Sequence, residues 1–168
     1  SVYNIKTKKD FCVIDVGSSS TTTTAYSDGQ FYINNTNNVG GNYFREAIAD
    51  LYGLDSIRAE EKKLELSKIS YTSQDKDVMN LMNLYFEKIV TDATRVIEFF
   101  RANNEEIYLC GGSSAIKGMA AYVESSSDIP TTELRDIIKI LFSGKIASEL
   151  DLEVYASAAG ATFREVDK

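Results

Sequence analysis

One apolar stripe constrains the fold more than any other feature of this 168-residue sequence. Between residues 78 and 100, apolar side chains recur three and four positions apart, at Val78, Leu81, Met82, Tyr85, Ile89, Ala93, Val96, Ile97 and Phe100. This spacing predicts one long helix. Because a lone apolar face has to be buried, we expect the helix to pack on a sheet and its stripe to form core.

Three short strands are expected before this helix. Residues 11–16 form an apolar run, residues 20–27 are rich in β-branched Thr, and Asp28-Gly29 leads into residues 30–36. Asp-Gly between two such runs is a strong hairpin signal. The Thr-rich run could instead be a linker, but Thr favours strands and the run leads directly into the hairpin turn.

The rest of the pattern alternates helices with strands. We expect a helix from Gly40-Gly41 to Gly53, a charged helix over 59–66, a strand over 107–110 and a helix over 115–123. After Pro130 we expect a short strand, a helix over 133–142 and a last helix over 153–164, although the periodicity between residues 125 and 152 is ambiguous. This order predicts the α/β class, with a mixed sheet flanked by helices.

Composition excludes several function classes. A chain with 43% hydrophobic residues can bury one core, so we expect a single domain over residues 1–168. The net charge of -7 repels nucleic acid and anionic lipid, and no apolar run approaches the roughly 20 residues that span a bilayer. The absence of His excludes zinc sites and His-based catalysis. Cys12 and Cys110 lie in apolar runs, which fits buried thiols in a reducing, cytoplasmic setting.

A carboxylate and a turn of small residues end the first expected strand. The segment reads Val13-Ile14-Asp15-Val16-Gly17 and continues with three serines. Backbone N–H groups and hydroxyls in such a turn can surround phosphate oxygens, and Asp15 can hold Mg²⁺ through water. A strand-terminal Asp before Gly is also often just a turn residue.

Two further motifs are weak by themselves. In Leu109-Cys110-Gly111-Gly112-Ser113, paired glycines let the chain approach a ligand without a Cβ in the way, and a phosphate or sugar is expected at the following helix. Ala59-Glu60-Glu61-Lys62-Lys63 lies on a predicted short helix, where solvated charge is the ordinary interpretation.

In this order, the three motifs resemble the C-terminal half of the actin-like ATPases, an RNase H-like fold shared by actin, MreB, FtsA, PilM and sugar kinases. The resemblance implies that the first motif is a phosphate-binding hairpin, the second the adenosine motif, and the third the Ala-Glu-x-x-Lys helix of MreB and FtsA. It implies ATP and Mg²⁺ as cofactors. It assigns magnesium to Asp15 through water, the phosphates to Gly17, Ser18, Ser19 and Ser20, the ribose to Glu60, the adenine to Lys63, and the nucleoside to Gly111, Gly112 and Ser113.

Within these ATPases the sequence is most similar to the PilM family of type IV pilus assembly. The matching features are Val39-Gly40-Gly41, Tyr52-Gly53-Leu54, the aromatic helix end Ile97–Phe100, and the small-residue end Ala156–Phe163. This resemblance implies subdomain 2A with a small 2B-like insert at about residues 53–75. It also implies an ATP-binding cytoplasmic scaffold, peripheral to the membrane, whose other half grips the cytoplasmic tail of a PilN-like membrane protein.

One departure and two alternatives accompany this resemblance. The family hairpin has more glycine where this chain has Ser18 and Ser19, and a Cβ is costly where φ is positive, so we expect weak nucleotide binding. Because Asp10 lies so near the start, we expect a fragment that lacks ATPase activity by itself. The alternatives are an FtsA- or MreB-like filament protein that self-associates, and half of a sugar- or acetate-kinase-like phosphotransferase.

Overall fold

The computed structural model describes residues 10–28, 30–69, 76–99 and 104–134. It contains, in chain order, β1 (Asp10–Val16), β2 (Thr21–Ser27), β3 (Gln30–Asn37), α1 (Gly41–Tyr52), α2 (Ser56–Leu66), α3 (Lys76–Phe99), β4 (Asn104–Cys110), α4 (Met119–Ser127) and β5 (Thr131–Glu133). The expected last helix and the Ala156–Phe163 motif lie outside the described residues, as does nearly all of the helix expected over 133–142.

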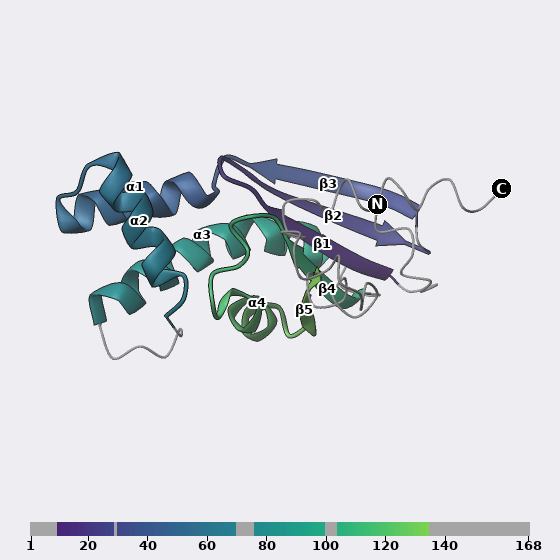
Figure 1. Cartoon of the computed structure of the whole chain (residues 1–168). Helices are drawn as coiled ribbons and strands as arrows, with labels where there is room; N and C mark the ends of the chain where they lie inside the picture. Colours follow the sequence, from purple (N-terminus) through teal and green to yellow (C-terminus); the bar gives the residue numbers. More distant parts are fainter. Residues whose placement is uncertain (1–9, 29, 70–75, 100–103, 135–168) are drawn as a thin grey trace, which may run out of the picture.

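The five described strands form one mixed sheet in the order β3-β2-β1-β4-β5 (Figure 1). β1, β2 and β3 pair antiparallel, whereas β4 is parallel to both β1 and β5. The predicted hairpin is confirmed: Ser27 pairs with Gln30, and Asp28 in the turn has a φ of 49°. The register places Asp15 between Thr22 on β2 and Cys110 on β4, at the end of β1.

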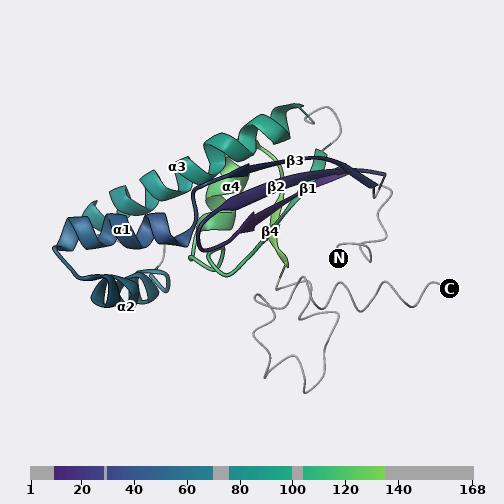
Figure 2. The same ribbon diagram turned by 90° about the horizontal axis from the view of Figure 1, so that it is seen from above.

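α3 is the long helix that the apolar stripe predicts. It lies along one face of the sheet and continues past the end of the strands, beside α1 (Figures 1 and 2). Its buried side chains join a single core cluster that also contains Ile14 of β1, Phe44 of α1 and Met119 of α4. The opposite face of the sheet carries a smaller cluster around Phe11, Val13 and Tyr108.

Two helix starts differ from the sequence prediction. α2 begins at Ser56, three residues before the expected start, because the Asp55 side chain accepts hydrogen bonds from the N–H groups of Ile57 and Arg58. α4 begins at Met119, so the prediction of a helix from Ala115 was wrong. Gly118 has a φ of 98°, which is incompatible with a helix, and turns therefore occupy the stretch after β4.

Candidate functional site

The turn between β1 and β2 is tight and unstrained. The N–H of Gly17 donates to the carbonyl oxygen of Ser20 over 2.9 Å, and Ser18 and Ser19 are exposed. Among the described residues other than glycine, only Asp28 and Asp128 have a positive φ. The predicted backbone cost of serine at positions 18 and 19 is therefore absent.

β1, β2 and the turn between them form a second hairpin, the β1–β2 hairpin, and the first turn of α1 is hydrogen-bonded to it. Gly41 N–H donates to the carbonyl oxygen of Gly17 over 3.0 Å, and Asn42 N–H donates to that of Ser18 over 2.7 Å. A Cβ on Gly40 would lie 2.6 Å from the Gly17 oxygen and 2.7 Å from the Ser18 oxygen. Only glycine fits there, because real Cβ atoms do not approach so closely.

Sequence reasoning treated Gly40-Gly41 as a helix start and missed this role. The available signal was the glycine pair followed by Asn42, whose side-chain amide nitrogen lies 3.3 Å from Ser19 Oγ as a hydrogen-bond donor. A helix start needs no second glycine, so the pair indicates a close approach of another backbone.

Asp15 lies at the carboxyl end of β1, beside the hairpin. Its side chain is exposed on one side, while the neighbouring strand ends remove water from the other side, and this burial raises the pKa of the carboxyl group. Within the described part of the chain, no hydrogen bond or ion pair occupies the carboxylate. A carboxylate in this state fits a hydrated Mg²⁺, which keeps several waters and takes few protein ligands.

The described residues contain no group of three or more metal-ligating side chains. A cation beside Asp15 would therefore depend on water and on the oxygens of a bound ligand for its other bonds. The role of Asp15 as a magnesium ligand through water stays a prediction.

The turn after β4 closes the site from the other side. Ser113 N–H donates to the carbonyl oxygen of Val16 over 3.0 Å, which ties the turn to the end of β1. Gly111 has a φ of 96°, and a Cβ there would collide with Asp15 Oδ1 and the Val16 backbone. Gly112, in contrast, has open space around it. Gly111 thus allows Asp15 and the turn to lie in direct contact.

α2 contributes the ion pair between Glu60 and Lys63 to the same region, next to Gly41 and Ser113. Lys63 Nζ lies 2.7 Å from Glu60 Oε1, and the Lys63 side chain is only 17% exposed. A Cβ on Gly41 would collide with Ser113 Oγ and would lie 3.6 Å from Lys63 Nζ. The N–H of Lys117 also donates to the carbonyl oxygen of Ser67 over 3.1 Å, joining the end of α2 to the stretch before α4.

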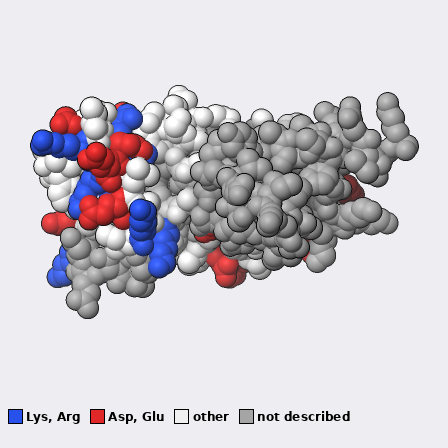
Figure 3. Space-filling view, in the orientation of Figure 1, with Lys and Arg blue, Asp and Glu red and all other residues white. Residues whose placement is uncertain are grey.

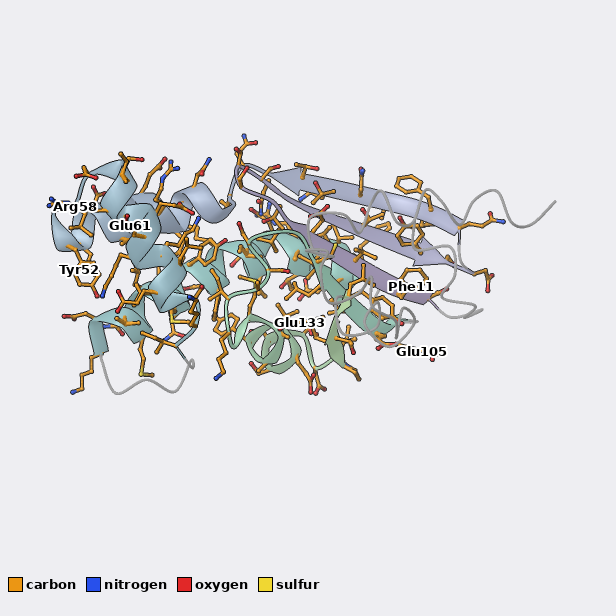
Figure 4. All side chains as sticks on the ribbon, viewed as in Figure 1. Phe11, Tyr52, Arg58, Glu61, Glu105 and Glu133 are labelled. Atoms are coloured by element: carbon orange, nitrogen blue, oxygen red, sulfur yellow. The ribbon has the colours of Figure 1, made fainter. Side chains whose placement is uncertain are left out.

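The three motifs therefore meet around one glycine. Gly41 is bonded to the hairpin and faces both Ser113 and Lys63. Arg58 and Glu61 of α2 lie with Tyr52 of α1 at the end of the molecule far from the strands (Figure 4). Lys/Arg and Asp/Glu side chains alternate over this end of the molecule (Figure 3), which is ordinary for a solvated surface.

A hollow of about 280 Å³ lies elsewhere, on α3, and is lined by Leu84, Glu87, Lys88, Thr91 and Asp92. It contains none of the motif residues. We give more weight to the motif region, because three separate segments converge there with their polar groups.

The mixed sheet with its flanking helices has the fold of the actin-like ATPases, since solved structures of that class match it. The chain belongs to the type IV pilus assembly protein PilM family, whose model matches residues 2–165. A comparison with curated protein sequences finds no match. Among the described helices, none has the length and apolar character needed to cross a membrane.

Solved structures show the same fold. A PilM-PilN type IV pilus biogenesis complex matches with a TM-score of 0.75 and 21% identity, over 97% of this chain and 48% of that chain. MreB5 of Spiroplasma citri bound to AMPPNP matches with a TM-score of 0.64 and 18% identity, over 96% and 56%. The ethanolamine utilization protein EutJ from Carboxydothermus hydrogenoformans matches with a TM-score of 0.61 and 18% identity, over 74% and 44%. The chain thus spans about half the length of these proteins.

Proposed function

We propose that this chain is the nucleotide-binding half of a PilM-like component of the type IV pilus machinery, and that it acts as an ATP-binding scaffold for an inner-membrane partner. The observation that carries the proposal is the convergence of hairpin, Gly111–Ser113 turn and Lys63 around Gly41. Family membership favours this function over the filament and kinase alternatives.

Each motif has a task in this proposal. The serines of the hairpin line the phosphates, with Asp15 beside them to hold Mg²⁺ through water. The turn at Gly111 and Gly112 passes under the nucleoside, where the missing side chains leave room for it. Glu60 takes the ribose and Lys63 the adenine, starting from an ion pair that holds both side chains in position.

The relatives support a proposal for the partner and the location. One of the similar structures is a complex of PilM with PilN, which supports a PilN-like membrane protein as the partner. The cytoplasmic tail of this partner would bind the half of the protein that lies outside this chain. The protein would then lie in the cytoplasm, held at the membrane through that partner.

Calorimetric titration of the intact protein with Mg-ATP tests the nucleotide site. Lys63→Ala and Asp15→Ala are each expected to weaken binding at least tenfold. Lys62→Ala is the matched control, because Lys62 pairs with Glu65 over 3.0 Å and lies over the ring of Tyr52, away from Gly41. Unchanged affinity in both site variants, or an equal loss in the control, would reject the site.

The isolated chain provides a second comparison. It holds one wall of the site, so we expect little ATP affinity and no ATPase turnover from it. Micromolar binding or steady turnover by residues 1–168 would show that this chain contains a complete site.

A further inference from the structure

Asn42, in the first turn of α1, is joined to the turn of the β1–β2 hairpin by two hydrogen bonds. Its N–H donates to the carbonyl oxygen of Ser18 over 2.7 Å, and its side-chain amide donates to Ser19 Oγ over 3.3 Å. Ser18 and Ser19 are exposed, and Asn42 is half-buried. Asn42 therefore lies beside the serines that line the phosphates in the proposed function, although it belongs to none of the three motifs.

The N-terminal end of α1 does not itself offer a site for an anion. The N–H groups of Gly41 and Asn42 donate to carbonyl oxygens of the β1–β2 hairpin, and the N–H of Tyr43 donates to the carbonyl oxygen of Gly40. A helix end binds phosphate through N–H groups that lack such partners. A contribution of Asn42 to phosphate binding therefore has to come from its side chain.

The hydrogen bond between Asn42 and Ser19 fixes how the serine hydroxyl can act. The amide nitrogen only donates, so Ser19 Oγ accepts, and the hydroxyl hydrogen remains to be donated elsewhere. Among the described residues, no acceptor takes that hydrogen or the second hydrogen of the Asn42 amide. The oxygens of an ionised phosphate are acceptors, so two unused donors on hydrogen-bonded neighbours suit one phosphate group.

We propose that Asn42 is a further phosphate-binding residue. It holds Ser19 Oγ as an acceptor, and the free hydrogens of Ser19 and of the Asn42 amide are donated to one phosphate group of the nucleotide. This inference rests on the proposed function and adds a side chain of α1 to the site. Gly40 makes the arrangement possible, because a Cβ there would lie 2.7 Å from the Ser18 oxygen to which Asn42 N–H donates.

Titration of the intact protein with Mg-ATP and with adenosine, which has no phosphate, tests the role of Asn42. Asn42→Ala is expected to raise the dissociation constant of Mg-ATP by about tenfold or more, the effect of losing hydrogen bonds to a charged group, and to leave that of adenosine unchanged within about twofold. Asn42→Asp should weaken Mg-ATP further, because a carboxylate accepts the Ser19 hydrogen and repels the phosphate. Asn35→Asp is the charge-matched control, since exposed Asn35 pairs with Thr23 and so lies on the opposite face of the sheet from Asp15.

A double-mutant cycle with Ser19→Ala tests whether the two side chains act together. The loss of Mg-ATP affinity in the double variant should be smaller than the product of the two single losses, and losses that multiply would overturn the pairing. Lys63→Ala is the reference variant, because it should weaken both ligands.

Two results would overturn the inference and leave the proposed function in place. One is unchanged Mg-ATP affinity in both Asn42 variants while Lys63→Ala still weakens binding. The other is an equal loss of Mg-ATP and adenosine in Asn42→Ala, because Asn42 would then only support the fold of the site. An intact protein that binds no Mg-ATP would reject the proposed function, and this inference with it.

Discussion

Gly40 makes the closest backbone approach to the hairpin, and this gives a prediction at the residue scale. Gly40→Ala would push a Cβ against the backbone of Gly17, Ser18 and Ser20, which cannot move independently. We expect the free energy of unfolding to fall by roughly 1–3 kcal/mol, the usual range for overpacking. Urea denaturation measures this change. Gly112→Ala is the control and should stay within about 0.5 kcal/mol, because open space surrounds Gly112.

The Tyr85 hydroxyl leads to a second prediction at this scale. Its oxygen is buried and has no hydrogen-bond partner among the described residues, while its ring stacks on Phe44 at 4.8 Å. Tyr85→Phe keeps the stacked ring and removes the unpartnered hydroxyl. We therefore expect the free energy of unfolding to rise by about 1 kcal/mol at pH 7. The comparison is Tyr108→Phe, which loses a 2.7 Å hydrogen bond to Glu106 and should lose about 1 kcal/mol. A loss of stability in Tyr85→Phe would contradict this interpretation.

The same residue predicts a pH dependence. Burial raises the pKa of Tyr85, so the folded state holds the phenol proton more tightly than the unfolded state does. This contribution to stability is complete below about pH 10, the ordinary tyrosine pKa, and is lost as the pH rises further. Tyr85→Phe lacks that loss. Its advantage in melting temperature should therefore widen above about pH 10, and an advantage that narrows there would be evidence against a buried phenol.

At the scale of elements, the start of α2 depends on one side chain. Asp55 Oδ1 accepts hydrogen bonds from Ile57 N–H at 3.1 Å and Arg58 N–H at 2.9 Å. Asp55→Ala should lower the free energy of unfolding by about 1 kcal/mol, the typical value for loss of an N-cap, as measured by urea denaturation. Asp55→Asn should retain most of the stability of the parent protein, because Asn is also a good N-cap. Because α2 carries Lys63, we also expect Mg-ATP to bind the intact protein more weakly in the alanine variant. Equal stability of the two variants would mean that the cap is unimportant.

The elements differ in how well local patterns predict them. The α3 stripe and the Asp28 turn act through short-range periodicity and backbone conformation, so the helix and the hairpin follow from sequence. The start of α4 could not be predicted in this way. Ala115 and Ile116 suit a helix, whereas the positive φ of Gly118, which prevents one, arises from the packed turn. Residues of all three motifs could be named in advance. Their meeting at Gly41 depends on β4 lying beside β1, a long-range pairing that no local pattern contains.

At the scale of the whole molecule, α3 connects its two ends. The helix has 24 residues and is about 36 Å long at 1.5 Å per residue. Tyr85 packs on Phe44 of α1, while farther along the helix Asp92 accepts a hydrogen bond from the Asn37 side chain at 3.0 Å. The core cluster runs without interruption from α1 to the strands. We infer that the α1–α2 end and the sheet unfold as one unit.

Breaking α3 in its middle tests this inference. Glu87 is exposed, so Glu87→Pro disturbs the backbone with little change in the core, and it should lower the free energy of unfolding by about 3 kcal/mol or more. Glu87→Ala keeps the helix and should stay within about 0.5 kcal/mol. In the proline variant, amide exchange should accelerate together in α1 and in β2, because both pack on α3. If α1 lost protection while β1, β2 and β4 kept theirs, the sheet would be an independent folding unit, and the proposed nucleotide contact of Lys63 would be lost without unfolding the β1–β2 hairpin.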